Sequence, residues 1–209
     1  TSITSGTISQ PLVLVASSAI TTPILCNGGG NAAITVSATG GTAPYSGTGT
    51  FSRAPGTYSF TVTDANGCTS ATSITVTQPA VLNATAVATP LPCGSTTTSV
   101  VVNATGGTAP YTGTGTFTVG AGPYSFTVTD ANGCTRTVTG RVNNLVTISV
   151  SAGTIACGQT TATVVVTASE GTAPYTGTGS FTVTAGTYTY TVTDANGCTS
   201  IASGGIGQS

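Results

Sequence analysis

The sequence repeats one module three times, and this repetition restricts the folds available to the chain. Gly-Thr-Ala-Pro-Tyr recurs at 41–45, 107–111 and 171–175, and Thr-Val-Thr-Asp-Ala-Asn-Gly-Cys recurs at 61–68, 127–134 and 191–198. Equivalent positions lie 66 and 64 residues apart, which is enough for a minimal domain with its own core. We predict three repeats at 12–79, 80–144 and 145–209.

The first eleven residues are predicted to be the tail of a preceding repeat. Residues 1–11 align with residues 69–79, which directly follow Cys68. A cysteine is therefore expected before Thr1, and we expect the chain to be a segment of a longer array.

The residue pattern predicts an all-β fold of tandem immunoglobulin-like antiparallel β-sandwich repeats. Near the end of the first repeat Tyr58, Phe60 and Val62 alternate with Ser and Thr, the period of a half-buried strand. In the second repeat we place strands at 81–89, 97–105, 111–119, 123–130 and 134–142. The tyrosine of this strand, Tyr58 and its counterparts Tyr124 and Tyr188, has the spacing of a tyrosine corner.

The recurring Asp-Ala-Asn-Gly is predicted to connect two strands, with Asp accepting backbone hydrogen bonds and Asn or Gly tolerating positive φ. These turn residues are Asp64, Asn66, Gly67, Asp130, Asn132, Gly133, Asp194, Asn196 and Gly197. The same motif resembles the opening of a calcium loop, but calcium needs six to eight oxygen ligands. We therefore predict turns and no metal site.

The six cysteines follow the repeat, with one early and one late in each copy. Fifteen pairings are possible in principle. We predict pairing inside each repeat, Cys26 with Cys68, Cys93 with Cys134 and Cys157 with Cys198. A zinc site is disfavoured because two thiols without histidine supply half of a four-ligand site.

Charged residues form 3% of the chain, and histidine and lysine are absent. Three arginines cannot form a basic face for nucleic acid, and acid–base catalysis lacks histidine, lysine and paired carboxylates. The most apolar stretch, residues 12–16, is far shorter than the roughly 20 residues of a membrane span. We expect no enzyme activity, no cofactor, no nucleic-acid partner and no membrane insertion by this segment.

The motifs together resemble the SprB repeat family of gliding adhesins and other large surface proteins of Bacteroidetes. The resemblance is carried by Cys26-Asn27-Gly28, residues 34–36, 40–45 and 56–68, and Gln78-Pro79. It implies an extracellular, disulfide-bonded sandwich repeat of a cell-surface protein, exported by the type IX secretion system and, in gliding species, carried along the cell as an adhesive filament.

The sequence departs from the pattern at two places, one in the third copy and one at the end of the second copy. Glu170 stands where Gly40 and Gly106 stand in the other copies, which makes a positive φ there less secure. Residues 142–144 read Val-Asn-Asn where the first copy closes with Gln-Pro, and we expect an altered junction between the second and third copies.

Two roles remain open for the tyrosines after the proline, Tyr45, Tyr111 and Tyr175. They could line a ligand groove, but we expect core packing with the hydroxyl bonded at the edge. The ligand-binding residues of the chain stay unknown at this point.

The sequence predicts a structural and adhesive function, in which neighbouring repeats are the partners and the segment forms a stalk or filament. The first alternative is a module that binds a surface glycan, another surface protein or the substratum. The second is a self-assembling surface fibre whose subunits are joined by strand donation.

Overall fold

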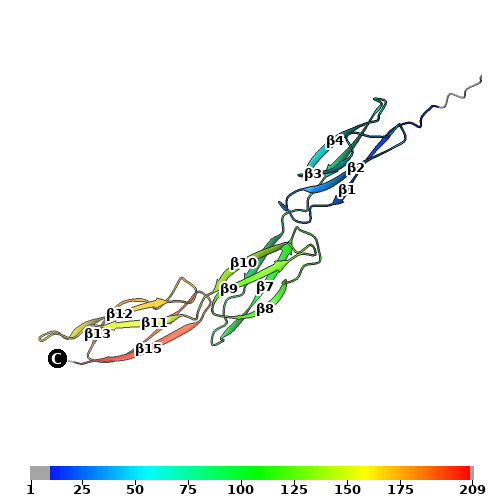
Figure 1. The fold of residues 1–209 in the computed structure, drawn as a ribbon. Helices are drawn as coiled ribbons and strands as arrows, with labels where there is room; N and C mark the ends of the chain where they lie inside the picture. The colour runs from blue at the N-terminus through cyan, green and yellow to red at the C-terminus, as the bar shows by residue number, and fades with distance from the viewer. Residues whose placement is uncertain (1–9, 208–209) are drawn as a thin grey trace, which may run out of the picture. The chain divides into compact units, whose positions relative to one another are not determined.

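The computed structural model describes residues 10–207, which form fifteen β-strands and no helix (Figure 1). The first five are β1 (Val15–Thr22), β2 (Ala32–Thr39), β3 (Gly49–Arg53), β4 (Gly56–Thr63) and β5 (Thr69–Val76). The next five are β6 (Asn83–Ala88), β7 (Thr97–Thr105), β8 (Gly115–Gly120), β9 (Gly122–Thr129) and β10 (Thr135–Val142). The last five are β11 (Thr147–Ala152), β12 (Thr161–Ser169), β13 (Gly179–Thr184), β14 (Gly186–Thr193) and β15 (Thr199–Ile206). The all-β prediction is confirmed, while the immunoglobulin-like topology stays a prediction.

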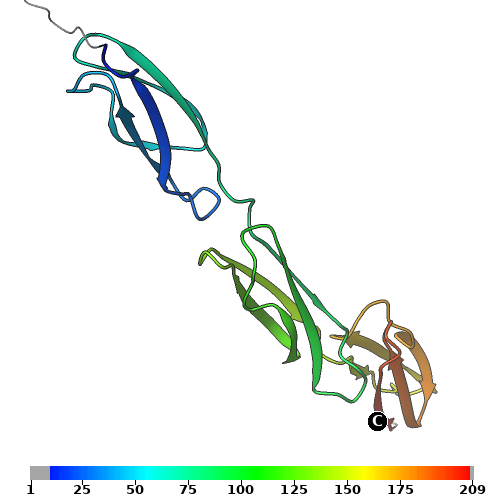
Figure 2. The ribbon, with the colours of Figure 1, turned by 90° about the vertical axis from the view of Figure 1, so that its right-hand side faces the viewer.

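Each set of five strands forms its own pair of sheets, with the same arrangement in every set. A three-stranded sheet has the order β1-β2-β3, β6-β7-β8 or β11-β12-β13, and a hairpin follows it as β4-β5, β9-β10 or β14-β15. The pairing is antiparallel in both kinds of sheet, as between β1 and β2 and between β4 and β5. Strands of each set are neighbours in sequence, so they share similar colours in Figures 1 and 2.

The predicted strand at 111–119 was too long at its beginning. Gly113 has a φ of 80°, which is not extended backbone, and β8 begins at Gly115. The other four strands of the second set agree with the prediction within about two residues.

The core of the first five strands lies between their two sheets. Ile34 and Val36 of β2 pack in one buried cluster with Phe60 and Val62 of β4, and Ile34 and Val62 are fully buried. Ser59 and Thr61, on the other face of β4, are exposed. The predicted alternation of faces is therefore confirmed.

The last five strands enclose an equivalent core. Val164 and Val166 of β12 cluster with Val192 of β14 and Ile206 of β15. Phe181 and Tyr190 lie with ring centroids 4.7 Å apart, as Phe51 and Phe60 do at 4.8 Å in the first set. Because the repeated sequence places apolar residues at the same strand positions, the same core forms again.

The described residues divide into two compact units. The first comprises residues 10–83 with Thr105–Tyr111 and Thr129–Thr135, and the second comprises Ala84–Ala104, Thr112–Val128 and residues 136–207. The division runs through the second set of strands, and the predicted repeat boundaries stay a prediction. Most of the predicted tail at 1–11 lies outside the described residues.

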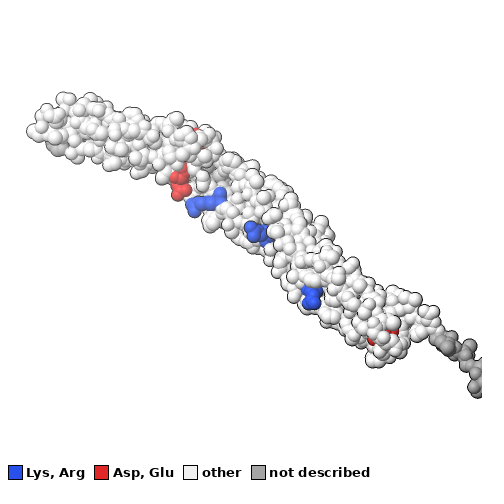
Figure 3. Space-filling view, turned by 90° about the horizontal axis from the view of Figure 1, so that it is seen from above, with Lys and Arg blue, Asp and Glu red and all other residues white. Residues whose placement is uncertain are grey.

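Charged side chains are few on the surface (Figure 3). Within residues 10–207 no helix is long and apolar enough to cross a membrane. Several large apolar side chains are exposed, with Leu12 at 81% and Val13 at 80% the most exposed of them.

Candidate functional site: the aspartate turn and the repeat junction

A buried aspartate organises the turn between the fourth and fifth strands of each set. Asp64 is 6% exposed. Its Oδ1 accepts the backbone N–H groups of Asn66 and Cys68 at 2.9 and 2.8 Å, and its Oδ2 accepts that of Thr42 at 2.9 Å. Asn66 Nδ2 also donates to Thr42 Oγ1 at 2.9 Å. The carboxylate and the amide thereby tie the turn to the Gly-Thr-Ala-Pro-Tyr loop.

The other two copies repeat this arrangement. Asp130 accepts backbone N–H groups from Thr108, Asn132 and Cys134, and Asp194 accepts them from Thr172, Asn196 and Cys198. The glycines before the cysteines, Gly67, Gly133 and Gly197, have φ values of 86°, 82° and 81°. The structure thus places the predicted turn residues together at one end of each set of strands.

The amide donors also set the charge state of the turn. The backbone N–H of Thr42 is the largest influence on the pKa of Asp64, and it holds that pKa below its ordinary value of 3.8 against the opposing effect of burial. For Asp130 burial acts most strongly and in the raising direction, but the N–H groups of Thr108, Cys134 and Asn132 together outweigh it and lower the pKa. Both carboxylates are therefore anionic at neutral pH.

We next asked whether the aspartate turns could bind a metal ion, as the opening of a calcium loop would. The described residues contain no group of three or more His, Cys, Asp or Glu side chains placed to hold an ion. Each turn carboxylate instead has both oxygens engaged by backbone amides, as shown for Asp64 and Asp130.

The predicted disulfide pairing is wrong. Cys26 is bonded to Cys134, with their Cα atoms 5.7 Å apart, and Cys93 is bonded to Cys198, with 5.1 Å between Cα atoms. Cys68 and Cys157 are free and exposed. None of the pairs 26 with 68, 93 with 134 and 157 with 198 forms. Each bond instead joins the early cysteine of one repeat to the late cysteine of the next.

The direction of the strands explains why pairing inside a repeat fails. Cys26 lies between the end of β1 and the beginning of β2, beside the end of the sandwich where Ala32 pairs with Arg53. The chain then runs the length of β4 before it reaches Cys68 at the opposite end. Eight strand residues span about 26 Å, whereas a disulfide needs Cα atoms about 4.4–6.8 Å apart. The two cysteines of one repeat cannot meet.

Hydrogen bonds surround the first of these disulfides. Asn27 Nδ2 donates to the carbonyl oxygen of Pro79 at 3.0 Å, and the N–H of Gly28 donates to Gln78 Oε1 at 2.9 Å. Asn132 Nδ2 donates to the carbonyl oxygen of Leu25 at 3.0 Å, next to Cys26. The Cys-Asn-Gly loop is therefore held both to the Gln-Pro linker and to the following aspartate turn.

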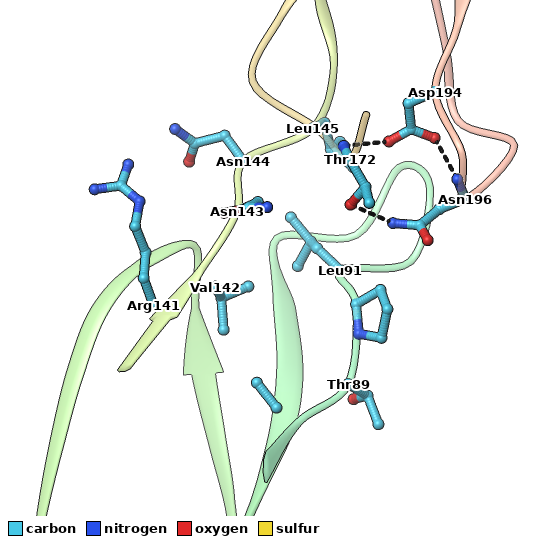
Figure 4. Close-up of a pocket in the computed structure, with 12 residues that line it drawn as sticks. Thr89, Leu91, Arg141, Val142, Asn143, Asn144, Leu145, Thr172, Asp194 and Asn196 are labelled. Atoms are coloured by element: carbon cyan, nitrogen blue, oxygen red, sulfur yellow. Dashed lines mark hydrogen bonds between the residues drawn. The ribbon is translucent and has the colours of Figure 1, made fainter. Parts of the chain in front are cut away.

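A hollow of about 170 Å³ lies at the second junction (Figure 4). Leu91 lines it from the loop that contains Cys93, Asn143 lines it from the linker, and Asp194 and Asn196 line it from the turn. Arg141, near the end of β10, also lines the hollow. This junction thus combines a disulfide with a small, mainly polar recess.

The tyrosines after the proline use their hydroxyls inside their own loops. Tyr45 donates to the carbonyl oxygen of Gly40, Tyr111 to that of Gly106, and Tyr175 to that of Glu170. Tyr45 packs against the first core and Tyr175 against the last. These contacts are those expected of structural residues.

The tyrosines of the predicted corner have different surroundings in different copies. Tyr58 donates from its hydroxyl to the carbonyl oxygen of Ala54 at 3.0 Å, a bond to upstream backbone like that of a tyrosine corner. The rings of Tyr124 and Tyr188 lie directly against Gly140 and Gly204, where a Cβ atom would collide with them.

Two features were missed from the sequence. The first is the pairing between repeats: the strand directions between Cys26 and Cys68 would have excluded pairing inside a repeat, but they do not identify the partner. The second is Arg53, whose guanidinium carbon lies 5.5–6.0 Å from the ring centroids of Phe51, Tyr58 and Phe60, within the range of a cation–π contact. The sequence feature that could have predicted this contact is the position of Arg53, close to a strand rich in aromatic residues.

The fold and its junctions define a tandem β-sandwich repeat protein in which disulfides connect successive repeats. Residues 18–46 match the model of the SprB repeat family, so the chain carries an SprB repeat, as its motifs predicted. SprB repeats belong to a structural, adhesin-type family of cell-surface proteins, and the fold agrees with that class. A comparison with curated proteins gives no match.

Proposed function

We propose that this chain is a structural segment in the stalk or filament of a large, extracellular bacterial adhesin. The observation that supports the proposal best is the bonding of Cys26 to Cys134 and of Cys93 to Cys198. Each of these bonds reinforces a linker between repeats. A bond inside one repeat would stabilise that repeat alone.

The mechanical consequence follows from the order of the four cysteines. When the chain is pulled at its ends, the covalent path from Cys26 to Cys198 crosses both disulfides and follows the backbone for the 41 residue steps from Cys134 back to Cys93. Without the bonds the path would follow the backbone for all 172 residue steps from Cys26 to Cys198. Oxidised repeats therefore resist elongation even when their sandwiches open.

The disulfides also favour a location outside the cytoplasm, where such bonds persist. From the family we further propose export by the type IX secretion system. In a gliding species the segment would belong to an adhesin that takes part in gliding motility. Neighbouring repeats are the proposed partners, and a surface glycan or the substratum would be bound by other parts of the adhesin.

The proposed role is not enzymatic. The whole chain contains no histidine and no lysine, and the buried carboxylates that could act as acids or bases are engaged by backbone amides. General acid–base catalysis needs a group that is free to exchange a proton with a substrate.

A second candidate function is glycan binding by the repeats themselves. It is favoured by the recess at the second junction, where Arg141, Asn143 and Asn196 offer hydrogen-bonding groups. The first repeat has the different Gln78-Pro79 linker at the corresponding place, so this recess would be particular to one junction.

Binding and proteolysis distinguish the two candidates. The oxidised chain is tested for saturable binding to bacterial and plant polysaccharides, and Arg141→Ala serves as the recess variant. The structural role predicts no saturable binding and slow proteolysis that accelerates on reduction. Saturable binding that Arg141→Ala abolishes would support the glycan-binding function instead.

A further inference from the structure

We propose that Asn27-Gly28 is a latent deamidation site, and that the Gln78-Pro79 linker keeps it closed. The inference goes beyond the proposed structural role, because it concerns a covalent change of the chain that the role does not require. Asparagine followed by glycine is the dipeptide that loses its side-chain amide most readily. Glycine has no side chain that would shield its own backbone nitrogen or restrict its backbone.

The reaction consumes only water. The backbone nitrogen of Gly28 attacks Cγ of Asn27, the bond from Cγ to Nδ2 breaks, and ammonia leaves with the proton of the Gly28 N–H. Water then adds to one of the two carbonyl carbons of the succinimide ring and opens it. The product is either aspartate at position 27 or isoaspartate, in which the side-chain carboxyl group carries the main chain.

Two hydrogen bonds to the linker hold the groups that would react. The N–H of Gly28 donates to Gln78 Oε1 at 2.9 Å, and Asn27 Nδ2 donates to the carbonyl oxygen of Pro79 at 3.0 Å. Cyclisation requires the side chain of Asn27 to turn toward the Gly28 nitrogen, and it requires that nitrogen to lose its proton. Each of these changes breaks one contact with the linker, so the docked linker opposes the reaction.

The other contacts of the junction hold the same loop. The disulfide to Cys134 anchors Cys26, the residue before Asn27. The side chain of Asn132 donates to the carbonyl oxygen of Leu25 at 3.0 Å. Asn27 itself is exposed, so water can reach it. Its protection therefore comes from these contacts and not from burial.

The other three Asn-Gly pairs of the chain lie in the aspartate turns and are held differently. In each turn the glycine N–H donates to the carbonyl oxygen of the turn aspartate, as Gly67 does to Asp64 at 3.1 Å. The asparagine side chain donates to a threonine hydroxyl, as Asn66 does to Thr42 at 2.9 Å. These partners belong to the same set of strands as the turn, so their contacts do not need the linker.

The asparagine and the glutamine that holds it occur together at the first junction. The early cysteine is followed by Asn-Gly at residues 26–28, but directly by glycine at residues 93–94 and 157–158. The first linker reads Gln78-Pro79, whereas residues 142–144 of the second linker read Val-Asn-Asn. The latent site and its lock therefore belong to one junction.

Deamidation would remove a contact that opposes it. A carboxylate at position 27 has no N–H group to donate to the carbonyl oxygen of Pro79. It would instead place a negative oxygen beside an acceptor that has lost its donor, which is unfavourable. The modified loop would hold the linker less firmly, and the lost amide is not restored by docking the linker again. The pair thus marks any period in which the linker was undocked.

Deamidation rates at the four Asn-Gly pairs test the proposal within one chain. The oxidised chain is incubated in mildly alkaline buffer, and the reduced chain in guanidinium chloride is the unprotected reference. Peptide mass spectrometry follows the mass increase at each pair. We expect Asn27 to deamidate at least tenfold more slowly in the folded chain than in the reference. Equal rates would overturn the proposal, because the contacts would then give no protection.

A linker variant separates the lock from general protection by the fold. Gln78→Ala removes the acceptor of the Gly28 N–H and should raise the rate at Asn27 at least fivefold, while the rates at Asn66 and Asn196 stay unchanged. Gln159→Ala is the matched control, since Gln159 is exposed and lies in the loop between β11 and β12. It should leave all four rates unchanged.

Two outcomes for the linker variant would overturn the lock. One is an unchanged rate at Asn27, and the other is an equal rise at Asn66 and Asn196, since the substitution would then have loosened the whole fold. Either outcome would leave the structural role standing, because that role is tested separately by polysaccharide binding and proteolysis.

Discussion

Asn144 donates a hydrogen bond from Nδ2 to Oε2 of Glu170 at 3.0 Å. Asn144 lies in the altered linker that closes the second copy, and Glu170 lies in the altered glycine loop of the third copy. Glu170 has a φ of 61°, so it keeps the left-handed backbone of the glycine that it replaces. The altered linker and the altered loop are therefore in contact.

The contact leads to a prediction about which loop positions accept a side chain. A Cβ at Gly106 would collide with the carbonyl oxygen of Val81, whereas Glu170 already carries a Cβ at the equivalent position. Gly106→Ala should lower the free energy of unfolding by more than about 2 kcal/mol, from left-handed backbone strain together with the collision. Urea denaturation of the oxidised chain measures this change.

Glu170→Ala is the matched variant for that experiment. It keeps a non-glycine residue at a φ of 61° and removes an exposed hydrogen bond, so the free energy of unfolding should change by no more than about 1 kcal/mol. Equal losses for Gly106→Ala and Glu170→Ala would contradict the role of the Val81 carbonyl.

The aspartate turns predict an acid-sensitive fold. The pKa of Asp64 and that of Asp130 lie below the ordinary value of 3.8 in the folded chain. A lowered pKa contributes stability that is fully present above the unfolded-state pKa and is lost as pH falls through the folded-state pKa. The melting temperature should stay level from pH 7 to about pH 5 and fall below about pH 4.

Amide variants separate this titration from general acid effects. Asp64→Asn and Asp130→Asn should melt at a lower temperature than the parent at pH 7, because an Asn side chain cannot accept the three backbone N–H groups with two charged oxygens. Their melting temperatures should also depend less on pH between 5 and 2. A parent chain with the same melting temperature at pH 7 and pH 2 would show that the turns contribute no such stability.

Single-molecule extension tests the path through the disulfides. Pulled at both ends, the oxidised chain should expose about 140 Å of extended backbone between Cys26 and Cys198, against about 600 Å after reduction, at about 3.3–3.6 Å per residue. Cys68→Ser is the control and should leave the oxidised length unchanged, because Cys68 is free. Lengthening of the oxidised Cys68→Ser chain would favour the pairing inside the repeat that the sequence predicted.

The core predicts a strong contrast between the two faces of one strand. Val62 is fully buried between the sheets, and Val62→Ala should lower the free energy of unfolding by about 2 kcal/mol. Thr61→Ala, on the exposed face of β4, should stay within about 0.5 kcal/mol of the parent. Chemical denaturation of both variants decides whether β4 faces the core as described.

Several features of the site could be predicted because they depend on local chemistry. The turn at Asp64 needs a short carboxylate side chain and backbone N–H groups a few residues later that can donate to it. Residues 64–68 provide both, because the N–H groups of Asn66 and Cys68 donate to Asp64 Oδ1. The hydroxyl of Tyr45 bonds within its own loop, as a tyrosine beside a proline turn was expected to do. The contact between Asn144 and Glu170 could not be predicted, because 26 residues separate the two and only the packing of the loop against the linker brings them together.

By itself the amino-acid sequence determined the strands, their buried faces and the repeating turns, since alternation and turn chemistry act over a few neighbouring residues. The tertiary structure alone decided the partner of each cysteine. Antiparallel strands carry Cys26 and Cys68 to opposite ends of one sandwich, and the linker brings the turn that contains Cys134 to Cys26. A disulfide forms between the thiols that lie within reach, and reach depends on the direction of every strand in between.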